Sequence, residues 1–165
     1  MADLQLTGKR FAALRIRRVA LCLACLAFTL TSLAEKVRLS ECPAPVRATI
    51  EQNLLGGKLD GIKAIRINDH VLYLVEIDLK GFREAKLYIS GDGSLRKIIE
   101  EIRLRDLPEP VRHAVEQQVK RRAQIEDIEK ETIEGRVRYR IEIDPPKQKD
   151  RTVVFEANGS ISFDK

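Results

Sequence analysis

The sequence has few histidines and cysteines, two residue types common in catalytic and metal sites. It has two histidines, His70 and His113, and neither lies at zinc-ligand spacing from Cys42. It contains no Gly-x-Ser-x-Gly nucleophile motif and no phosphate-binding glycine loop. Acidic residues in the strand-like segments alternate with apolar ones, a pattern typical of a solvated sheet face. We therefore predict no catalytic residues, no metal site and no cofactor, so the chain is not expected to be an enzyme.

Net charge and cysteine are also scarce once the first 34 residues are set aside. Residues 1–34 carry five bases and one acid, so they account for most of the net charge of +5. The near-neutral remainder gives no reason to expect a nucleic-acid partner. Cys22 and Cys25 lie in the same stretch, which leaves Cys42 as the single thiol of the remainder. We expect a buried thiol rather than an intermolecular disulfide, because Cys42 lies beside a helix start with apolar neighbours.

Residues 1–34 have the three parts of a secretory signal peptide. A basic head that ends at Arg18 precedes an apolar run from Val19 to Leu33, and small residues at Ser32 and Ala34 suit a signal peptidase. The run is shorter than the roughly 20 residues that a transmembrane helix needs. We therefore predict cleavage after Ala34, no stable membrane span afterwards, and a periplasmic or secreted mature chain.

The remaining sequence repeats itself. The segment 39–47 (LSECPAPVR) matches the segment 104–112 (LRDLPEPVR) at an offset of 65. Further along the offset is 66, so Tyr73 matches Tyr139, and the DGSL sequence at 92–95 matches NGSI at 158–161. Such regular repetition indicates duplication. We predict a signal peptide at 1–34, a first repeat at 35–103 and a second repeat at 104–165.

Each repeat is predicted to be one helix followed by strands. In the first repeat, apolar residues at helical spacing predict a helix from Ser40 or Cys42 to Leu55. The predicted strands are Leu59–Ile67, Val71–Leu79, Ala85–Ser90 and Leu95–Leu104. The last of these also fits a helix, but the Asp92-Gly93 turn before it favours a strand. In the second repeat Asp106 is a predicted N-cap. The predicted fold class is α+β, with two tandem repeats, each one helix followed by a four-stranded antiparallel meander sheet.

The order of these motifs resembles the PepSY and PepSY-like domains, also described as β-lactamase-inhibitor-protein-like. The shared pattern is a Leu-Pro-x-x-Val helix start, an aromatic-bearing strand such as Val137–Ile143, and a closing Asp/Asn-Gly hairpin. The resemblance covers about residues 38–165, as two tandem copies. It implies an exported α+β module that binds or inhibits proteins and has no shared catalytic residues.

The two copies differ on the strand face opposite Tyr73. Leu72 and Leu74 of the first copy correspond to Arg138 and Arg140 of the second. The leucines either pack on the other copy or form a partner-binding patch, and the sequence leaves both interpretations open. In the second interpretation, apolar contacts and complementary charges come from six residues: Leu72, Leu74, Tyr88, Arg138, Arg140 and Glu142.

These patterns favour an exported, non-enzymatic module that binds an unidentified protein partner and inhibits or regulates an exported hydrolase by occlusion. One alternative is an envelope sensor that binds ions or small ligands at the acidic strand positions. Another is a structural envelope protein that self-associates. The sequence does not fix the oligomeric state.

Overall fold

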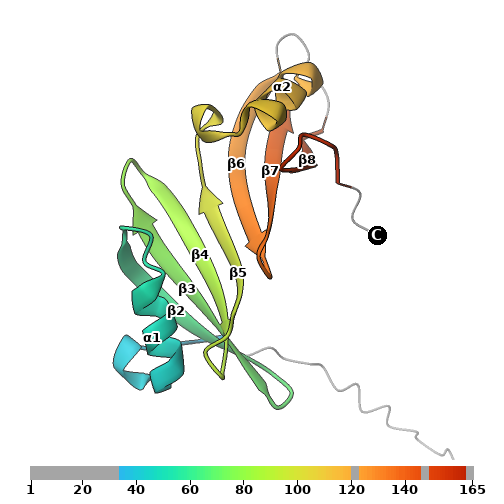
Figure 1. The fold of residues 1–165 in the computed structure, drawn as a ribbon. Coiled ribbons are helices and arrows are strands. Elements are labelled where there is room, and N and C mark those ends of the chain that lie inside the picture. The colour runs from blue at the N-terminus through green and yellow to red at the C-terminus, as the bar shows by residue number, and fades with distance from the viewer. Residues whose placement is uncertain (1–33, 120–122, 146–148, 163–165) are drawn as a thin grey trace, which may run out of the picture.

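The structure is a computed structural model, and it describes residues 34–119, 123–145 and 149–162 (Figure 1). The chain forms the following elements in order: β1 (Ala34–Lys36), α1 (Ala44–Gln52), β2 (Lys58–Ile67), β3 (His70–Leu79), β4 (Arg83–Ser90), β5 (Leu95–Glu101), α2 (Glu109–Gln118), β6 (Gln124–Ile133), β7 (Arg136–Asp144) and β8 (Arg151–Glu156). Short 3-10 turns at Leu39–Glu41 and Leu104–Asp106 precede the two helices. The predicted signal peptide lies outside the described residues, except for Ala34, which begins β1.

All the strands belong to one eight-stranded antiparallel sheet, in chain order from β1 to β8. The predicted fold class of two repeats, each with its own four-stranded sheet, is therefore wrong. The two halves are joined because β5 pairs with β6, with Ile99 opposite Glu131 at the middle of the ladder. If each half had its own sheet, β5 and β6 would each have an edge of unpaired backbone N–H and C=O groups. Pairing β5 with β6 satisfies the groups on both edges.

The second half also has fewer strands than predicted. After β8 the described residues, which end at 162, make a single bridge, between Phe155 and Ile161, where the repeat predicts a fourth strand. At the other edge, the unpredicted strand β1 pairs with β2 through Ala34 and Ile65. Within the described residues, no helix is long and apolar enough to cross a membrane.

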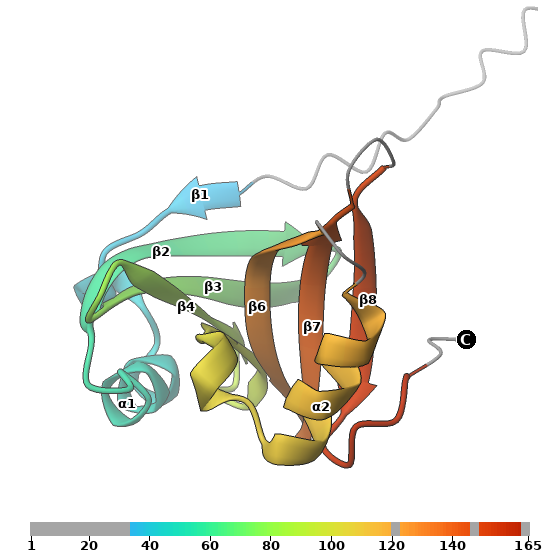
Figure 2. The same cartoon turned by 90° about the horizontal axis from the view of Figure 1, so that it is seen from above.

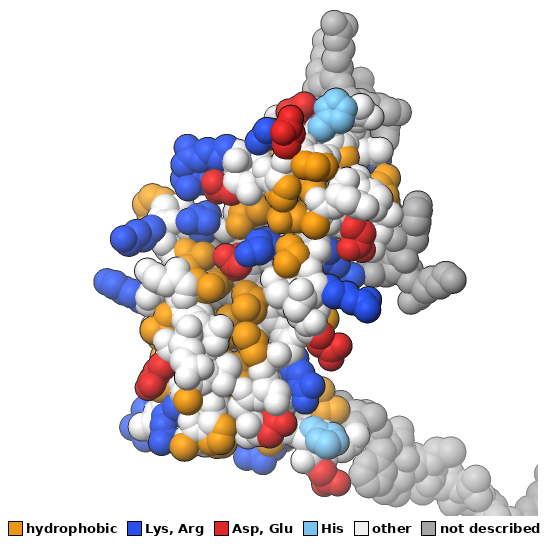
Figure 3. Space-filling view, in the orientation of Figure 1, with side chains coloured by type: hydrophobic (Ala, Val, Ile, Leu, Met, Phe, Trp, Pro, Cys, Tyr) orange, Lys and Arg blue, Asp and Glu red, His pale blue; other side chains and the backbone are white. Residues whose placement is uncertain are grey.

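The helices α1 and α2 lie on the same face of the sheet, as Figures 1 and 2 show from two directions. Seen from this side, apolar side chains form a band down the middle of the molecule (Figure 3). Each helix covers its own core. Val46 and Ile50 of α1 are fully buried in the first core, and Val111 and Val115 of α2 are fully buried in the second. The first helix, predicted from apolar residues at helical spacing, is thus confirmed, with Val46 and Ile50 on its buried side.

Most predicted element boundaries hold to within a few residues. The segment after the Asp92-Gly93 turn is a strand, as predicted, although it ends at Glu101. The helix α1 is shorter than predicted and ends at Gln52. The predicted N-cap role of Asp106 is wrong, because Pro108 caps α2. Instead, the carboxylate of Asp106 accepts a hydrogen bond from the backbone N–H of Arg103 at 3.1 Å.

The start of each helix packs against a glycine turn in its own half. Gly93, at φ +88°, lies so close to Pro45 that an added Cβ would be 2.7–2.9 Å from that residue. Gly159, at φ +84°, meets Pro110 in the same way, with an added Cβ only 2.6 Å from the carbonyl oxygen. In the first half, Thr49 also donates a hydrogen bond to the carbonyl oxygen of Gly93 at 2.7 Å. These contacts fix each helix against the last hairpin of its half.

We predict that Gly93→Ala lowers the free energy of unfolding by about 3 kcal/mol, because it adds a clash with Pro45 to left-handed backbone strain. Gly81→Ala is the matched control. Gly81 has a similar φ of +82°, but an added Cβ would meet nothing within 4 Å. The control is expected to lose only about 1–2 kcal/mol. Urea unfolding of both variants measures the difference, and equal losses would show that the contact with Pro45 contributes nothing.

Candidate protein-binding face

The six residues proposed from the sequence as a binding patch all lie on the sheet face opposite the two helices, here called the helix-free face. In β3, Tyr73, Val75 and Ile77 are buried on the helix side. Because side chains alternate along a strand, Leu72 and Leu74 lie on the helix-free face. Tyr88 pairs directly with Leu74 and shares this face. The same alternation around buried Tyr139, Ile141 and Ile143 places Arg138, Arg140 and Glu142 there.

The first half of the helix-free face is largely apolar. Leu72, Leu74 and Tyr88 are each half-buried, and Ile65 pairs with Leu72 on the neighbouring strand. Within the described part of the chain, Leu72 and Leu74 belong to neither of the two cores. These residues therefore give the face a partly exposed apolar surface that neither helix covers.

A buried ion cluster lies where the two halves meet on this face. The side chain of Glu131, on β6, is only 1% exposed. One carboxylate oxygen lies 2.7 Å from Lys97 Nζ on β5, and the other lies 2.5 Å from Arg138 Nε on β7. The two cations remain 26% exposed. Glu131 thus holds Lys97 and Arg138 in fixed positions at the surface.

Sequence reasoning found Arg138 but missed Glu131 and Lys97. The repeat offset places Glu131 at the position of Ile65 in the first copy, so a carboxylate stands where an apolar residue is expected. This mismatch is the sequence signal that could have identified it. Burial raises the pKa of the Glu131 carboxyl, but the hydrogen bonds from Lys97 and Arg138 outweigh that effect and hold the pKa below its usual value.

Arg140 and Glu142 lie further along the same face, in a more acidic region. Together with Asp127 and Glu129 they line a shallow hollow of about 230 Å³. Burial, together with the negative charge of Asp127, raises the pKa of Glu129. Arg140 pairs across the strands with Glu129, and Glu142 with Asp127.

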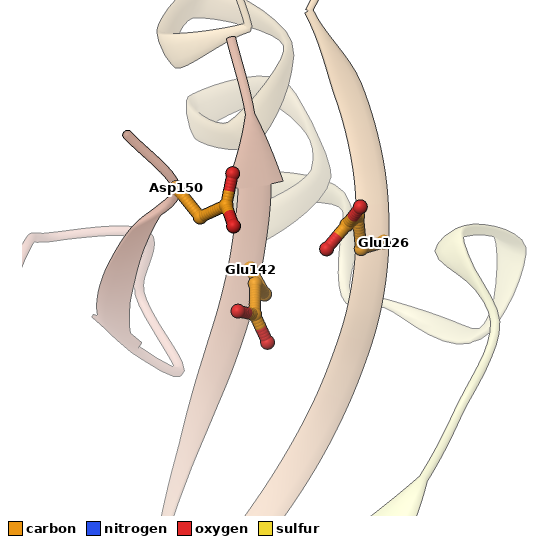
Figure 4. A group of neighbouring side chains, drawn as sticks. All are labelled: Glu126, Glu142 and Asp150. Atoms are coloured by element: carbon orange, nitrogen blue, oxygen red, sulfur yellow. The ribbon is translucent and has the colours of Figure 1, made fainter. Parts of the chain in front are cut away.

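Glu142 also belongs to a group of three carboxylates. Oxygens of Glu126, Glu142 and Asp150 lie within 4.8 Å of one another (Figure 4). They come from β6, from β7 and from the residue just before β8. Burial and then the charge of Asp150 raise the pKa of Glu126, so the three groups are in mutual repulsion. Carboxylate oxygens in such a group are the ligand type that calcium prefers.

The remaining candidate residues lie apart from this face. Cys42 is a free, buried thiol, as expected, and its Sγ donates to the carbonyl oxygen of Arg38 at 3.6 Å. Burial raises its pKa, which makes the reactive thiolate less available. His70 begins β3, and His113 in α2 is hydrogen-bonded to Gln117.

No protein-family model matches the chain, and no curated protein matches its sequence. Solved structures of bacterial proteins do match its fold. A BLIP-like protein from Bacteroides fragilis has a TM-score of 0.57 at 13% identity, covering 75% of this chain and 85% of its own. A candidate periplasmic protein from Bacteroides eggerthii has a TM-score of 0.58 at 14% identity, and the match covers 73% of this chain and 85% of that protein. A DUF2874 family protein from Bacteroides uniformis has a TM-score of 0.57 at 15% identity, and the match covers 73% of this chain and 86% of that protein. The chain therefore has a BLIP-like fold.

We predict that Glu131→Gln lowers the free energy of unfolding at pH 7 by about 2–3 kcal/mol, because it removes the buried negative charge that pairs with both Lys97 and Arg138. The folded-state pKa of Glu131 is lowered, so its charge stabilises the protein above the unfolded-state pKa of about 4.3. That contribution is lost as the pH falls through the folded-state pKa, and the variant and wild type should then converge.

Glu129→Gln is the matched control, on the same strand and the same face. Its folded-state pKa is raised, so its charge is unfavourable at pH 7 and its removal should not destabilise the protein. Urea unfolding at several pH values tests both variants. A Glu131→Gln protein as stable as wild type at pH 7 would contradict the proposed role of the ion cluster.

Proposed function

We propose that this chain is an exported, non-enzymatic module that binds a protein partner on the helix-free face of its sheet. The observation that carries the proposal is that one open face combines an apolar patch with a pre-ordered ion cluster. The BLIP-like fold of its structural neighbours supports a protein-binding role. Export is supported by the predicted signal peptide.

The chemistry of the face suits protein recognition. Leu72, Leu74 and Tyr88 provide apolar area of the kind that forms the centre of an interface, and tyrosine and arginine dominate binding energy in such interfaces. Because Glu131 already holds Lys97 and Arg138 in place, less side-chain entropy is lost when a partner binds. We infer that the partner contacts the apolar patch and places acidic groups near these cations.

We further propose that the chain is a PepSY-like protein made of two copies, at 35–103 and 104–165, and that it inhibits or regulates an exported hydrolase by occlusion. The matching contacts of Gly93 with Pro45 and of Gly159 with Pro110 support the duplication. A sheet face that covers a partner's surface needs no chemistry of its own, which agrees with the lack of a recognisable catalytic motif in the sequence.

The prediction for the partner-binding face uses a photo-reactive benzoylphenylalanine at position 88, in the exported protein in its native cell envelope. We expect one discrete protein adduct from position 88 and none from position 116, an exposed site on α2. Leu74→Glu should weaken the interaction about tenfold or more, because it places a charge in the apolar patch.

Thermal unfolding of Leu74→Glu is the control, and a native-like transition would show that a lost adduct reflects lost binding. If position 88 gives no protein adduct, or positions 88 and 116 give the same adducts, the helix-free face is not the binding surface.

A cation sensor is the second candidate function, and the group of Glu126, Glu142 and Asp150 is the observation that favours it. If calcium binds there, millimolar calcium should raise the Tm, because it neutralises the mutual repulsion of the three carboxylates. Glu126→Gln should reduce that shift, whereas Glu116→Gln on α2 should leave it unchanged. A Tm that calcium does not change would remove this candidate.

A further inference from the structure

Two large apolar residues occupy backbone conformations that usually belong to other residue types. Phe82 has a φ of +57° and a fully exposed side chain, and Leu55 has a φ of +55° and is 42% exposed. Positive φ is strained for bulky side chains and is best tolerated by glycine, asparagine and aspartate. The other non-glycine residues with positive φ in the described chain are Asn68 and Glu134, which are polar.

Phe82 therefore has two unfavourable features in the free protein, backbone strain and full exposure of an aromatic ring. Leu55 shares the strain and is partly exposed. Strained residues of this kind persist where the surrounding structure or a function requires them. Neither residue belongs to the two cores, within the described part of the chain. The fold of the monomer thus gives no reason for an apolar side chain at either position.

The two residues lie at the same end of the sheet. Phe82 is in the turn between β3 and β4, which forms the upper left tip in Figure 1. Lys80 and Arg83, on either side of Phe82 in the chain, line a hollow of about 280 Å³ together with Leu55. Leu79 contributes a further apolar wall to this hollow. The exposed aromatic ring is therefore carried by a turn beside a small, mostly polar hollow, in which Leu55 and Leu79 are the apolar residues.

The turn that carries Phe82 is braced by hydrogen bonds at its base. Arg83 donates from Nε to the carbonyl oxygen of Lys80 at 3.3 Å, and from Nη1 to that of Glu101 at 3.1 Å. The backbone N–H of Glu84 also donates to the carboxylate of Glu101 at 3.0 Å. A braced turn fixes the backbone that carries the ring, so less backbone entropy is lost when the ring enters a pocket.

We propose that Phe82 and Leu55 form a second contact site for the protein partner, in which the Phe82 ring inserts into an apolar pocket of a folded protein. This inference rests on the proposed protein-binding function but uses a different surface. Exposed Lys80 near the ring can pair with a single acidic group at the edge of the partner's pocket. An anionic membrane is disfavoured as the occupant, because the exposed acids Asp78 and Glu84 flank the same turn.

The first test separates a binding role from a structural one. Asparagine tolerates positive φ and is polar, so Leu55→Asn and Phe82→Asn should each raise the Tm of the free protein by about 2–4 °C. Glu134→Asn, at a positive-φ turn without an apolar side chain, is the matched control for the backbone effect alone. A Phe82→Asn protein that unfolds at a lower temperature than wild type would show that the ring serves the fold, and would overturn the proposal.

The second test uses benzoylphenylalanine at position 82, compared with the same residue at position 134, in the native cell envelope. We expect a discrete protein adduct from position 82 only, reduced at least fivefold by Lys80→Glu. A lipid adduct, or the absence of any protein adduct, overturns the proposal. If position 88 gives an adduct and position 82 does not, this site fails while the helix-free face stands. The opposite result removes the helix-free face and keeps this site.

Discussion

The pairing of β5 with β6 is the interaction on which the rest of the structure depends. It turns two strand groups into one sheet, and it continues past the ladder through the hydrogen bond from the N–H of Ile102 to the carbonyl oxygen of Ile128. The same segment also contacts both cores. Ile98 of β5 packs against the first core, and Ile102, the residue after β5, packs against the second. Both helices lie on one face, and within the described residues no helix covers the opposite face.

The open face has a composition that stability alone does not explain. Buried ion pairs can often be replaced by apolar residues of similar volume with no loss of stability, so they are weak evidence for a stabilising role. Glu131 stands where the first copy has Ile65, yet it is buried and holds two cations at fixed positions. The same reasoning applies to Phe82 and Leu55. Both apolar side chains are exposed, and both residues have a positive φ that is strained for a bulky side chain. In both places, we propose that recognition of a partner is the reason for features that the free fold does not require.

Local pattern predicted much of this structure, and long-range pairing explains most of what it missed. Alternation in β3 was enough to place Leu72 and Leu74 on the face opposite Tyr73, and the repeat then placed Arg138 and Arg140 on the same face. The joining of the halves depends on which exposed edges meet, and no local signal in Leu95–Glu101 specifies β6 as its neighbour. Glu131 was missed because β6 reads as mostly polar, and its burial depends on Lys97, which lies 34 residues away in the chain. The exposure of Phe82 was not evident because this residue lies between the predicted strands Val71–Leu79 and Ala85–Ser90, where alternation gives no information on burial.

Native-state hydrogen exchange shows whether β5–β6 pairing makes one cooperative sheet. We expect the backbone amides that bond across β5 and β6 to exchange as slowly as those in the middle of β3 and β7, because they open only when the whole sheet unfolds. Exchange at the β5–β6 amides that is faster by two or more orders of magnitude, with both cores still protected, would contradict this expectation. The molecule would then be two units in contact, and the ion cluster of Glu131 would not be a fixed surface.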